Sequence, residues 1–111
     1  RFDLGMAYRE MGLVDDATKE FEAAAGDPRW QARALVMMAD MLAHQGKTTD
    51  AIAKLEQAAE AARTGDERSE ANYELGVLYG NLGELDKAIA RLEAVAAGYR
   101  DVDARLLEFR A

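Results

Sequence analysis

The chain carries few of the side chains that perform covalent or metal chemistry. His44 is the only histidine among 111 residues, and cysteine is absent. A Cys–His pair, a Ser–His–Asp triad or a transition-metal site needs more such groups, so these chemistries are largely excluded. We expect no metal and no cofactor. The lack of cysteine leaves the compartment open, since both a cytoplasmic and a periplasmic location are compatible with it.

The remaining polar residues and glycines do not form a catalytic motif either. Carboxylates are abundant, but spacings such as that of Glu56 and Glu60 suit a solvated helix surface. Gly76, Gly80 and Gly83 are not a phosphate-binding loop, because they lie within a predicted helix and at its end and follow no strand. We therefore expect that the chain is not an enzyme.

The charge balance limits the kinds of partner. The net charge is −7 and the isoelectric point is near 4.7, so nucleic acid and anionic membrane surfaces would be repelled at long range. The balance favours a basic ligand, although an acidic surface that serves only solubility explains it equally well. No apolar run approaches the length of a membrane span, and no signal peptide is visible, so direct membrane insertion is not expected.

One pattern of small and apolar residues occurs three times, and a glycine marks the middle of each copy. From Gly12 to Gly46 the step is 34 residues, and from Gly46 to Gly83 it is 37. Around these glycines the spacing is that of two short amphipathic helices joined by a tight turn. The three copies are Leu4-Gly5, Tyr8, Gly12, Ala17 and Phe21; Met38-Ala39, Leu42, Gly46, Ala51 and Leu55; and Leu75-Gly76, Tyr79, Gly83, Ala88 and Leu92. Recurrence at this length indicates a helical solenoid.

The pattern resembles the tetratricopeptide repeat family, whose unit is a helix, a turn and a second helix with small residues where the helices touch. The first and third copies contain L-G-x-x-Y, then G-x-x-x-x-A, then an aromatic residue or Leu four positions on. The resemblance implies an all-α fold, a right-handed α-solenoid of antiparallel helix pairs with about seven helices. It covers almost the whole chain, from Arg1 to about Ala97.

The recurring residues have structural roles that physical chemistry predicts. Gly5, Ala39 and Gly76 should allow the first helix of each pair to press on the second, as should Ala17, Ala51 and Ala88. Gly12, Gly46 and Gly83 should adopt the left-handed conformation that ends the first helix. Asp15, Thr49 and Asp86 follow each turn, where a polar acceptor or a negative charge favours the free N–H groups of the second helix.

In chain order, we expect one domain over 1–111, with repeats at about 1–27, 28–65 and 66–98. The first repeat should contain helices at 1–11 and 14–25, with Leu4 and Tyr8 inward, and a further helix should run over about 49–63. Gly26 should end a helix, Asp27 cap the next, and Pro28 occupy its first position. Trp30 should cover the joint between the first two repeats; a ligand platform is its alternative role.

The C-terminal part should contain one more helix. Gly98 should close the second helix of the third repeat. A helix at 101–110 should follow, with Asp101 or Asp103 as its cap. It is either a covering helix or the first helix of a cut-off fourth repeat. Because the chain opens without Met inside a helix, we expect a piece of a longer repeat protein.

By the family resemblance, the first helices of successive repeats line a groove that binds a peptide or helix. The residues that would face it are Phe2, Met6, Arg9, Arg33, Val36, Met37, Asp40, His44, Glu70, Tyr73, Glu74 and Val77. Some members of the family grip the C-terminal carboxylates of chaperones with a clamp of Lys, Asn and Arg. Here those places hold Phe2, Met6, Met37, Glu70 and Glu74, so the clamp is absent and the two glutamates would repel such a tail.

The predicted groove instead combines an acidic rim of Asp40, Glu70 and Glu74 with an apolar strip, which consists of Phe2, Met6, Val36, Met37, Tyr73 and Val77. An amphipathic helix or extended segment with apolar anchors and some Lys or Arg would fit both. We therefore expect a protein-interaction module, an adaptor or scaffold. Two alternatives stay open: the strip is covered in the intact protein, or the chain is a structural, self-associating segment with no ligand of its own.

Overall fold

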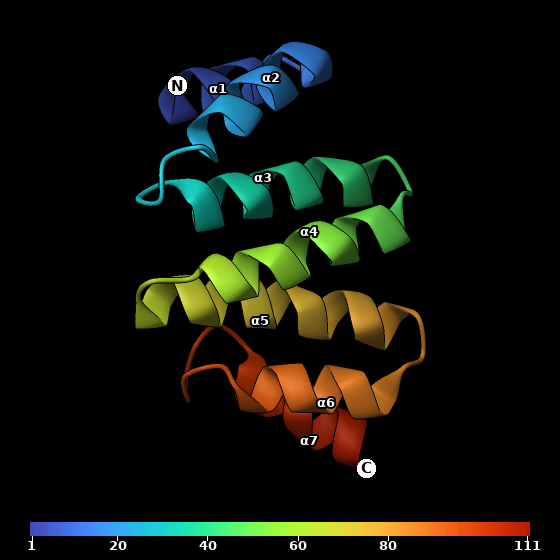
Figure 1. Cartoon of the computed structure of the whole chain (residues 1–111). Helices are drawn as coiled ribbons and strands as arrows, with labels where there is room; N and C mark the ends of the chain where they lie inside the picture. The colour runs from blue at the N-terminus through green and yellow to red at the C-terminus, as the bar shows by residue number, and fades with distance from the viewer.

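The computed structural model describes the whole chain, residues 1–111, as seven helices stacked in sequence order (Figure 1). They are α1 (Phe2–Glu10), α2 (Val14–Ala24), α3 (Gln31–His44), α4 (Thr48–Ala61), α5 (Gly65–Asn81), α6 (Leu85–Glu93) and α7 (Val102–Arg110). The stack measures 42 × 28 × 19 Å. The predicted all-α architecture of about seven helices in sequential antiparallel pairs is confirmed.

Three glycines make the turns within the helix pairs α1/α2, α3/α4 and α5/α6. Gly12, Gly46 and Gly83 have φ angles of +77°, +79° and +76°, which residues with a Cβ atom rarely adopt. After the first of these turns, the Leu13 N–H donates to the carbonyl oxygen of Tyr8 at 2.9 Å and so closes the end of α1. The left-handed role predicted for these three positions is confirmed.

Small residues let the paired helices touch. A Cβ atom added to Gly5 would lie 2.7 Å from Phe21, and one added to Gly76 would overlap Leu92. Ala17, Ala51 and Ala88 on the second helices are fully buried. The predicted close approach of the two helices in each pair is therefore confirmed.

The segment between α2 and α3 departs from expectation. Pro28 does not open α3; it lies in a separate turn over 27–30, in which the Trp30 N–H donates to the Asp27 carbonyl at 2.9 Å. The Asp27 carboxylate accepts from the Arg29 N–H at 2.9 Å and therefore caps this turn rather than α3. Trp30 stacks on Phe2, with ring centroids 5.1 Å apart, and thus covers the joint between the first two helix pairs as predicted.

One expectation for the C-terminal region is wrong, and a second is met in position only. α6 ends at Glu93, and Gly98 lies in the following loop at φ +81°. Asp101 occupies the N-cap position of α7, as expected, but its carboxylate makes no capping bond because it accepts from the Tyr73 hydroxyl and Arg105. Asp103 accepts from the Gly98 N–H at 3.0 Å. Tertiary partners and the loop thus compete with the helix end for these carboxylates.

The last helix lies behind α6 in Figure 1 and packs against α5 as well. Val102 is buried with Tyr73, Leu92 and Val95. Phe109 rests on Gly80, where an added Cβ atom would lie 2.6 Å from the ring. α7 therefore covers apolar surface of the third helix pair.

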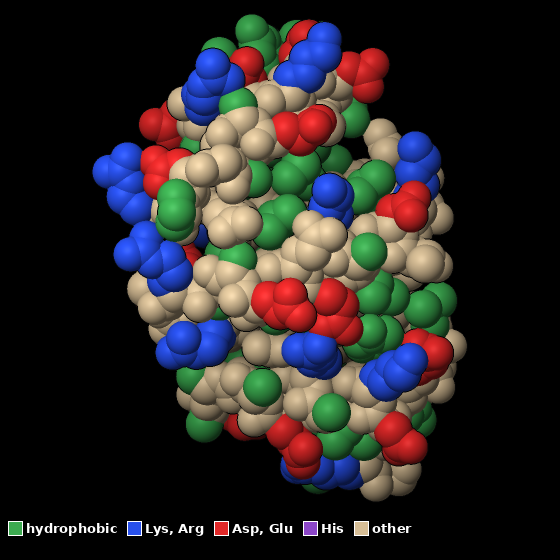
Figure 2. Space-filling model, viewed as in Figure 1, with side chains coloured by type: hydrophobic (Ala, Val, Ile, Leu, Met, Phe, Trp, Pro, Cys, Tyr) green, Lys and Arg blue, Asp and Glu red, His purple; other side chains and the backbone are tan.

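At the other end of the stack, Leu4 is 44% exposed rather than inward, because it lies on a side of α1 that no other helix covers. On the face shown in Figure 2, acidic and basic side chains are interspersed along the whole length, with no large patch of one sign. No helix combines the length and hydrophobicity needed to cross a bilayer.

Candidate functional site

A groove of about 280 Å³ crosses the middle of the stack, and we call it the central groove. Its walls come from α1, α3, α4, α5 and the loop before α7. The residues that line it are Arg9, Val36, Met37, Ala39, Asp40, Ala43, Leu55, Glu70, Glu74, Leu78 and Arg100. It is thus built by four helices and one loop that only the stacking of helix pairs brings together.

The floor of the central groove is apolar. Val36, Ala39 and Leu55 are buried beneath it, whereas Met37 and Leu78 are half-buried and pack against the same core. An unbranched methionine side chain adapts to irregular apolar shapes. The floor therefore offers adaptable apolar surface next to a rigid base.

Two of the three carboxylates in the central groove are already paired within the chain. Asp40 on α3 pairs with Arg9 on α1, and Glu74 on α5 accepts from Arg100 at 2.8 Å. Glu70 takes part in none of the side-chain hydrogen bonds or ion pairs of the chain. The rim is therefore less acidic than its carboxylates alone suggest, and its unmatched negative charge lies at Glu70.

The environment of Glu70 disfavours its ionised form. Partial burial is the main cause that raises the pKa of this carboxyl, and the positive charges of Arg33 and Arg100 only partly oppose the effect. A cation placed beside Glu70 would satisfy a carboxylate that the chain leaves without a partner.

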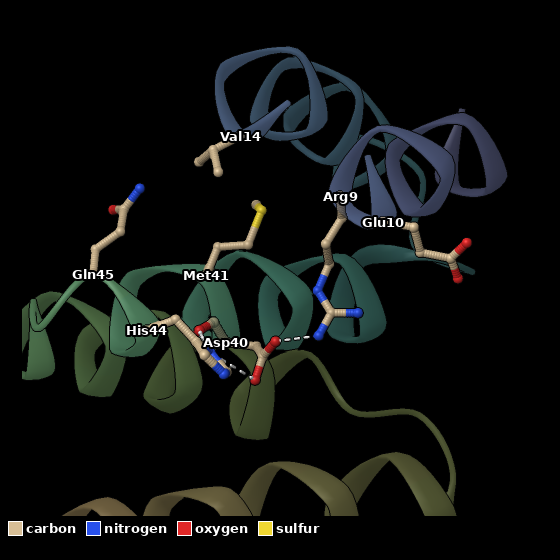
Figure 3. A pocket seen from close by; sticks show the side chains of 7 residues that line it. All are labelled: Arg9, Glu10, Val14, Asp40, Met41, His44 and Gln45. Carbon is tan, nitrogen blue, oxygen red and sulfur yellow. Dashed lines mark hydrogen bonds and ion pairs between the residues drawn. The ribbon is translucent and has the colours of Figure 1, made fainter. Parts of the chain in front are cut away.

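A second cavity, of about 360 Å³, opens at one edge of the joint between α1/α2 and α3 (Figure 3). We call it the side crevice. Val14 and Met41 face each other across it, and the Arg9–Asp40 pair forms the wall that it shares with the central groove. His44 also lines it and donates from Nδ1 to the Asp40 carbonyl oxygen at 2.8 Å, while Glu10 points away from the ion pair.

The structure brings half of the predicted groove residues together. The six that line the central groove are Arg9, Val36, Met37, Asp40, Glu70 and Glu74. His44 lies in the side crevice instead. Met6 and Val77 are half-buried and line neither cavity.

Three other predicted residues are engaged elsewhere. Phe2 is buried between Trp30 and Phe21, and the Arg33 guanidinium lies 4.8 Å from its ring centre. Tyr73 is buried, and its hydroxyl bonds to Asp101. These aromatic rings hold helices together rather than forming open groove surface.

Sequence reasoning missed Arg100 and four apolar lining residues, Ala39, Ala43, Leu55 and Leu78. The apolar four belong to the same helical stripes as the predicted core, so periodicity alone could not separate floor from interior. Arg100 comes from the loop before α7, where no periodic pattern exists. The only signal was its place between Tyr99 and Asp101 after a glycine.

Two models of the tetratricopeptide repeat family match the chain, one over residues 2–67 and the other over residues 42–111. The chain belongs to the tetratricopeptide repeat family. No curated protein matches it. Tetratricopeptide repeats are generally protein–protein interaction modules and are typically not catalytic. The central groove of this repeat protein is therefore a candidate docking site.

Proposed function

We propose that this tetratricopeptide repeat chain is an adaptor or scaffold that binds a peptide segment or helix of a partner protein in its central groove. The observation that carries the proposal is an unpaired, half-buried carboxylate, Glu70, beside an apolar floor that includes Met37 and Leu78. No catalytic role is proposed, because tetratricopeptide repeats are typically not catalytic.

The partner segment would carry apolar anchors. Met37 and Leu78 are only half-buried, so an apolar side chain laid on them removes further surface from water. Val36 and Leu55 beneath are fixed by the core and limit how deep an anchor can reach.

The partner segment would also carry Lys or Arg. Two arginines and three carboxylates line the central groove, which leaves one net negative charge. Arg9 and Arg100 are held by Asp40 and Glu74, so the groove does not offer the free cations that a carboxylate clamp requires. Charge complementarity thus favours a basic segment over an acidic tail.

The test is selection of peptides from a random display library with the whole chain as bait, followed by binding measurements on the selected peptides. Met37→Glu should abolish binding, because it buries a charge on the groove floor. Gln57→Glu on the exposed surface of α4 makes the same charge change outside the groove and should leave binding intact. Both variants must show unchanged helical melting.

A near-isosteric change then tests the charge argument. Glu70→Gln should weaken binding of selected peptides that contain Lys or Arg and spare those that do not. Equal binding by the wild-type, Met37→Glu and Glu70→Gln proteins would show that the central groove is not the docking site.

A second candidate is self-association through the ends of the stack. The exposed large aliphatic residues belong to the first helix pair, with Leu4, Met11 and Leu13, and to the α5/α6 turn and α7, with Leu82, Leu85 and Leu107. End-to-end contact between copies would cover both sets. Light scattering over a range of concentrations tests it, since a mass that stays monomeric up to high concentration excludes this role.

A further inference from the structure

Arg100 has an unusual backbone conformation. Its φ angle is +44°, and it is the only residue other than glycine with a positive φ. Side chains with a Cβ atom rarely occupy this region, and such residues concentrate at functional sites. The direction of the Arg100 side chain is therefore set by a conformation that most residues avoid.

The loop that carries Arg100 is fastened on both sides. The Gly98 N–H donates to Asp103 at 3.0 Å, and the Val102 N–H donates to the Tyr99 carbonyl at 3.0 Å. The Ala96 N–H donates to the buried Ser69 hydroxyl at 3.1 Å, which ties the loop to α5. These bonds hold the left-handed residue in place and fix the direction of its side chain.

The Arg100 guanidinium extends into the central groove. It donates to Glu74 at 2.8 Å and lies 5.0 Å and 5.3 Å from the ring centres of Tyr73 and Tyr99. Such stacking on aromatic faces orients a cation. The guanidinium also acts on the charge of Glu70 nearby.

We propose that Arg100 is an intramolecular occupant of a cation subsite, the place beside Glu70 and Glu74 that takes a Lys or Arg side chain of the partner, and that it thereby sets the specificity of the groove. The inference rests on the function proposed above. With Arg100 bound to Glu74, an incoming cation can pair only with Glu70. Without Arg100, both carboxylates would be open to the partner, and binding of basic segments would tighten.

The competing explanation is that Arg100 only anchors the loop before α7. The two roles predict opposite effects on binding. If Arg100 is an anchor, its removal loosens one wall of the groove and weakens every ligand. If it occupies the subsite, its removal strengthens basic ligands and leaves neutral ones unchanged.

The probes are two fluorescein-labelled amphipathic peptides of about 14 residues, long enough to form helix on binding. One contains leucine and lysine, and the other has glutamine in place of each lysine. Arg100→Gln should tighten binding of the leucine–lysine peptide on the order of three- to tenfold and leave the leucine–glutamine peptide unchanged. Arg100→Lys keeps the charge and should behave as the wild type.

The matched control is Arg110→Gln. Arg110 is exposed on α7, pairs with Glu93 at 2.6 Å and lies outside the central groove. Arg110→Gln changes the net charge by the same amount as Arg100→Gln, so any effect on binding that the two variants share is non-specific. Arg100→Gly removes the same cation while relieving the backbone, and it should reproduce the effect of Arg100→Gln even if the glutamine variant folds poorly.

The outcomes separate the two proposals. Suppose that Met37→Glu abolishes peptide binding, but that the Arg100 variants bind the leucine–lysine peptide no more tightly than Arg110→Gln does. This result overturns the occupant role of Arg100 and leaves the proposed function standing. Both proposals fail if Met37→Glu does not reduce binding of the leucine–lysine peptide in any of these proteins, Arg100→Gly included.

Discussion

Two glycines of α5 show how strongly a single hydrogen-to-methyl change depends on its surroundings. At Gly76 an added Cβ atom overlaps Leu92, which is fully buried, and reaches 3.4 Å from the Ala88 carbonyl. At Gly65 the same atom meets nothing within 4 Å. Gly76→Ala should lower the free energy of unfolding by about 1–3 kcal/mol, whereas Gly65→Ala should raise it by about 0.4–1 kcal/mol.

Urea denaturation of both glycine variants measures this difference. Similar midpoints for the two would mean that α5 and α6 do not depend on close contact at Gly76.

Glu70 provides a pH-dependent test at the same scale. Its pKa is raised in the folded chain, so the folded state holds the proton more tightly than the unfolded state. Stability should therefore fall as pH rises through the raised pKa. Glu70→Gln removes this effect, so it should melt at a higher temperature than the wild type near neutral pH, with the difference fading at about pH 4.

The control for this comparison is Glu60→Gln on the exposed surface of α4, which removes one negative charge without burial. If it raises the melting temperature as much as Glu70→Gln does, net charge rather than burial is the cause.

At the scale of elements, the joint between α4 and the pair α5/α6 is held by one polar network. The Tyr79 hydroxyl donates to Glu56 at 2.7 Å, and Arg91 pairs with the same carboxylate and donates to Asn72 at 3.1 Å. Burial first, and the hydrogen bond to Glu56 second, raise the pKa of Tyr79 to about 12. The network therefore depends on a protonated tyrosine.

Tyr79→Phe should lower the free energy of unfolding by about 1–2 kcal/mol near neutral pH, because Glu56 loses a donor. Because the pKa of Tyr79 is raised in the folded chain, its contribution to the free energy of unfolding is complete below the ordinary tyrosine pKa. This contribution is lost as pH rises toward about 12. The wild type should therefore lose stability between about pH 10 and 12 more steeply than Tyr79→Phe does. Tyr8→Phe, which removes a hydroxyl without such a bond, should keep the wild-type slope in alkaline denaturation measurements.

The elements were largely predictable, and their ends less so. Gly12, Gly46 and Gly83 located the turns because a left-handed residue has a local sequence signature. Pro28 and Gly98 were misplaced because each lies in a loop with hydrogen bonds of its own, from the Arg29 N–H to Asp27 and from the Gly98 N–H to Asp103, rather than at a helix end. Six of the predicted groove residues, from α1, α3 and α5, do line the central groove. Phe2 and Tyr73 instead pack against other aromatic rings, and hydrophobic periodicity does not reveal such pairs.

At the scale of the whole molecule, the charge of −7 is spread among interspersed positive side chains on the face in Figure 2, so long-range attraction of basic ligands should be modest. Between about 0.05 and 0.5 M NaCl, affinity for the leucine–lysine peptide should fall on the order of three- to tenfold, because screening shortens the reach of the groove's charge. The leucine–glutamine peptide should be insensitive to salt. Fluorescence anisotropy titrations measure both, and equal salt dependence would contradict a charge-selective groove.

The two joints of the stack are unequal, and this has a mechanical consequence. Between α1/α2 and α3/α4 a single ion pair, Arg9–Asp40, and the rings of Phe2 and Trp30 bridge a boundary that the side crevice already interrupts. Across the next joint, Glu56 accepts a hydrogen bond from Tyr79 and also pairs with Arg91. If the molecule were stretched between its termini, the joint between α2 and α3 would open first. The N-terminal helix pair would then separate at a lower force than the remaining helices.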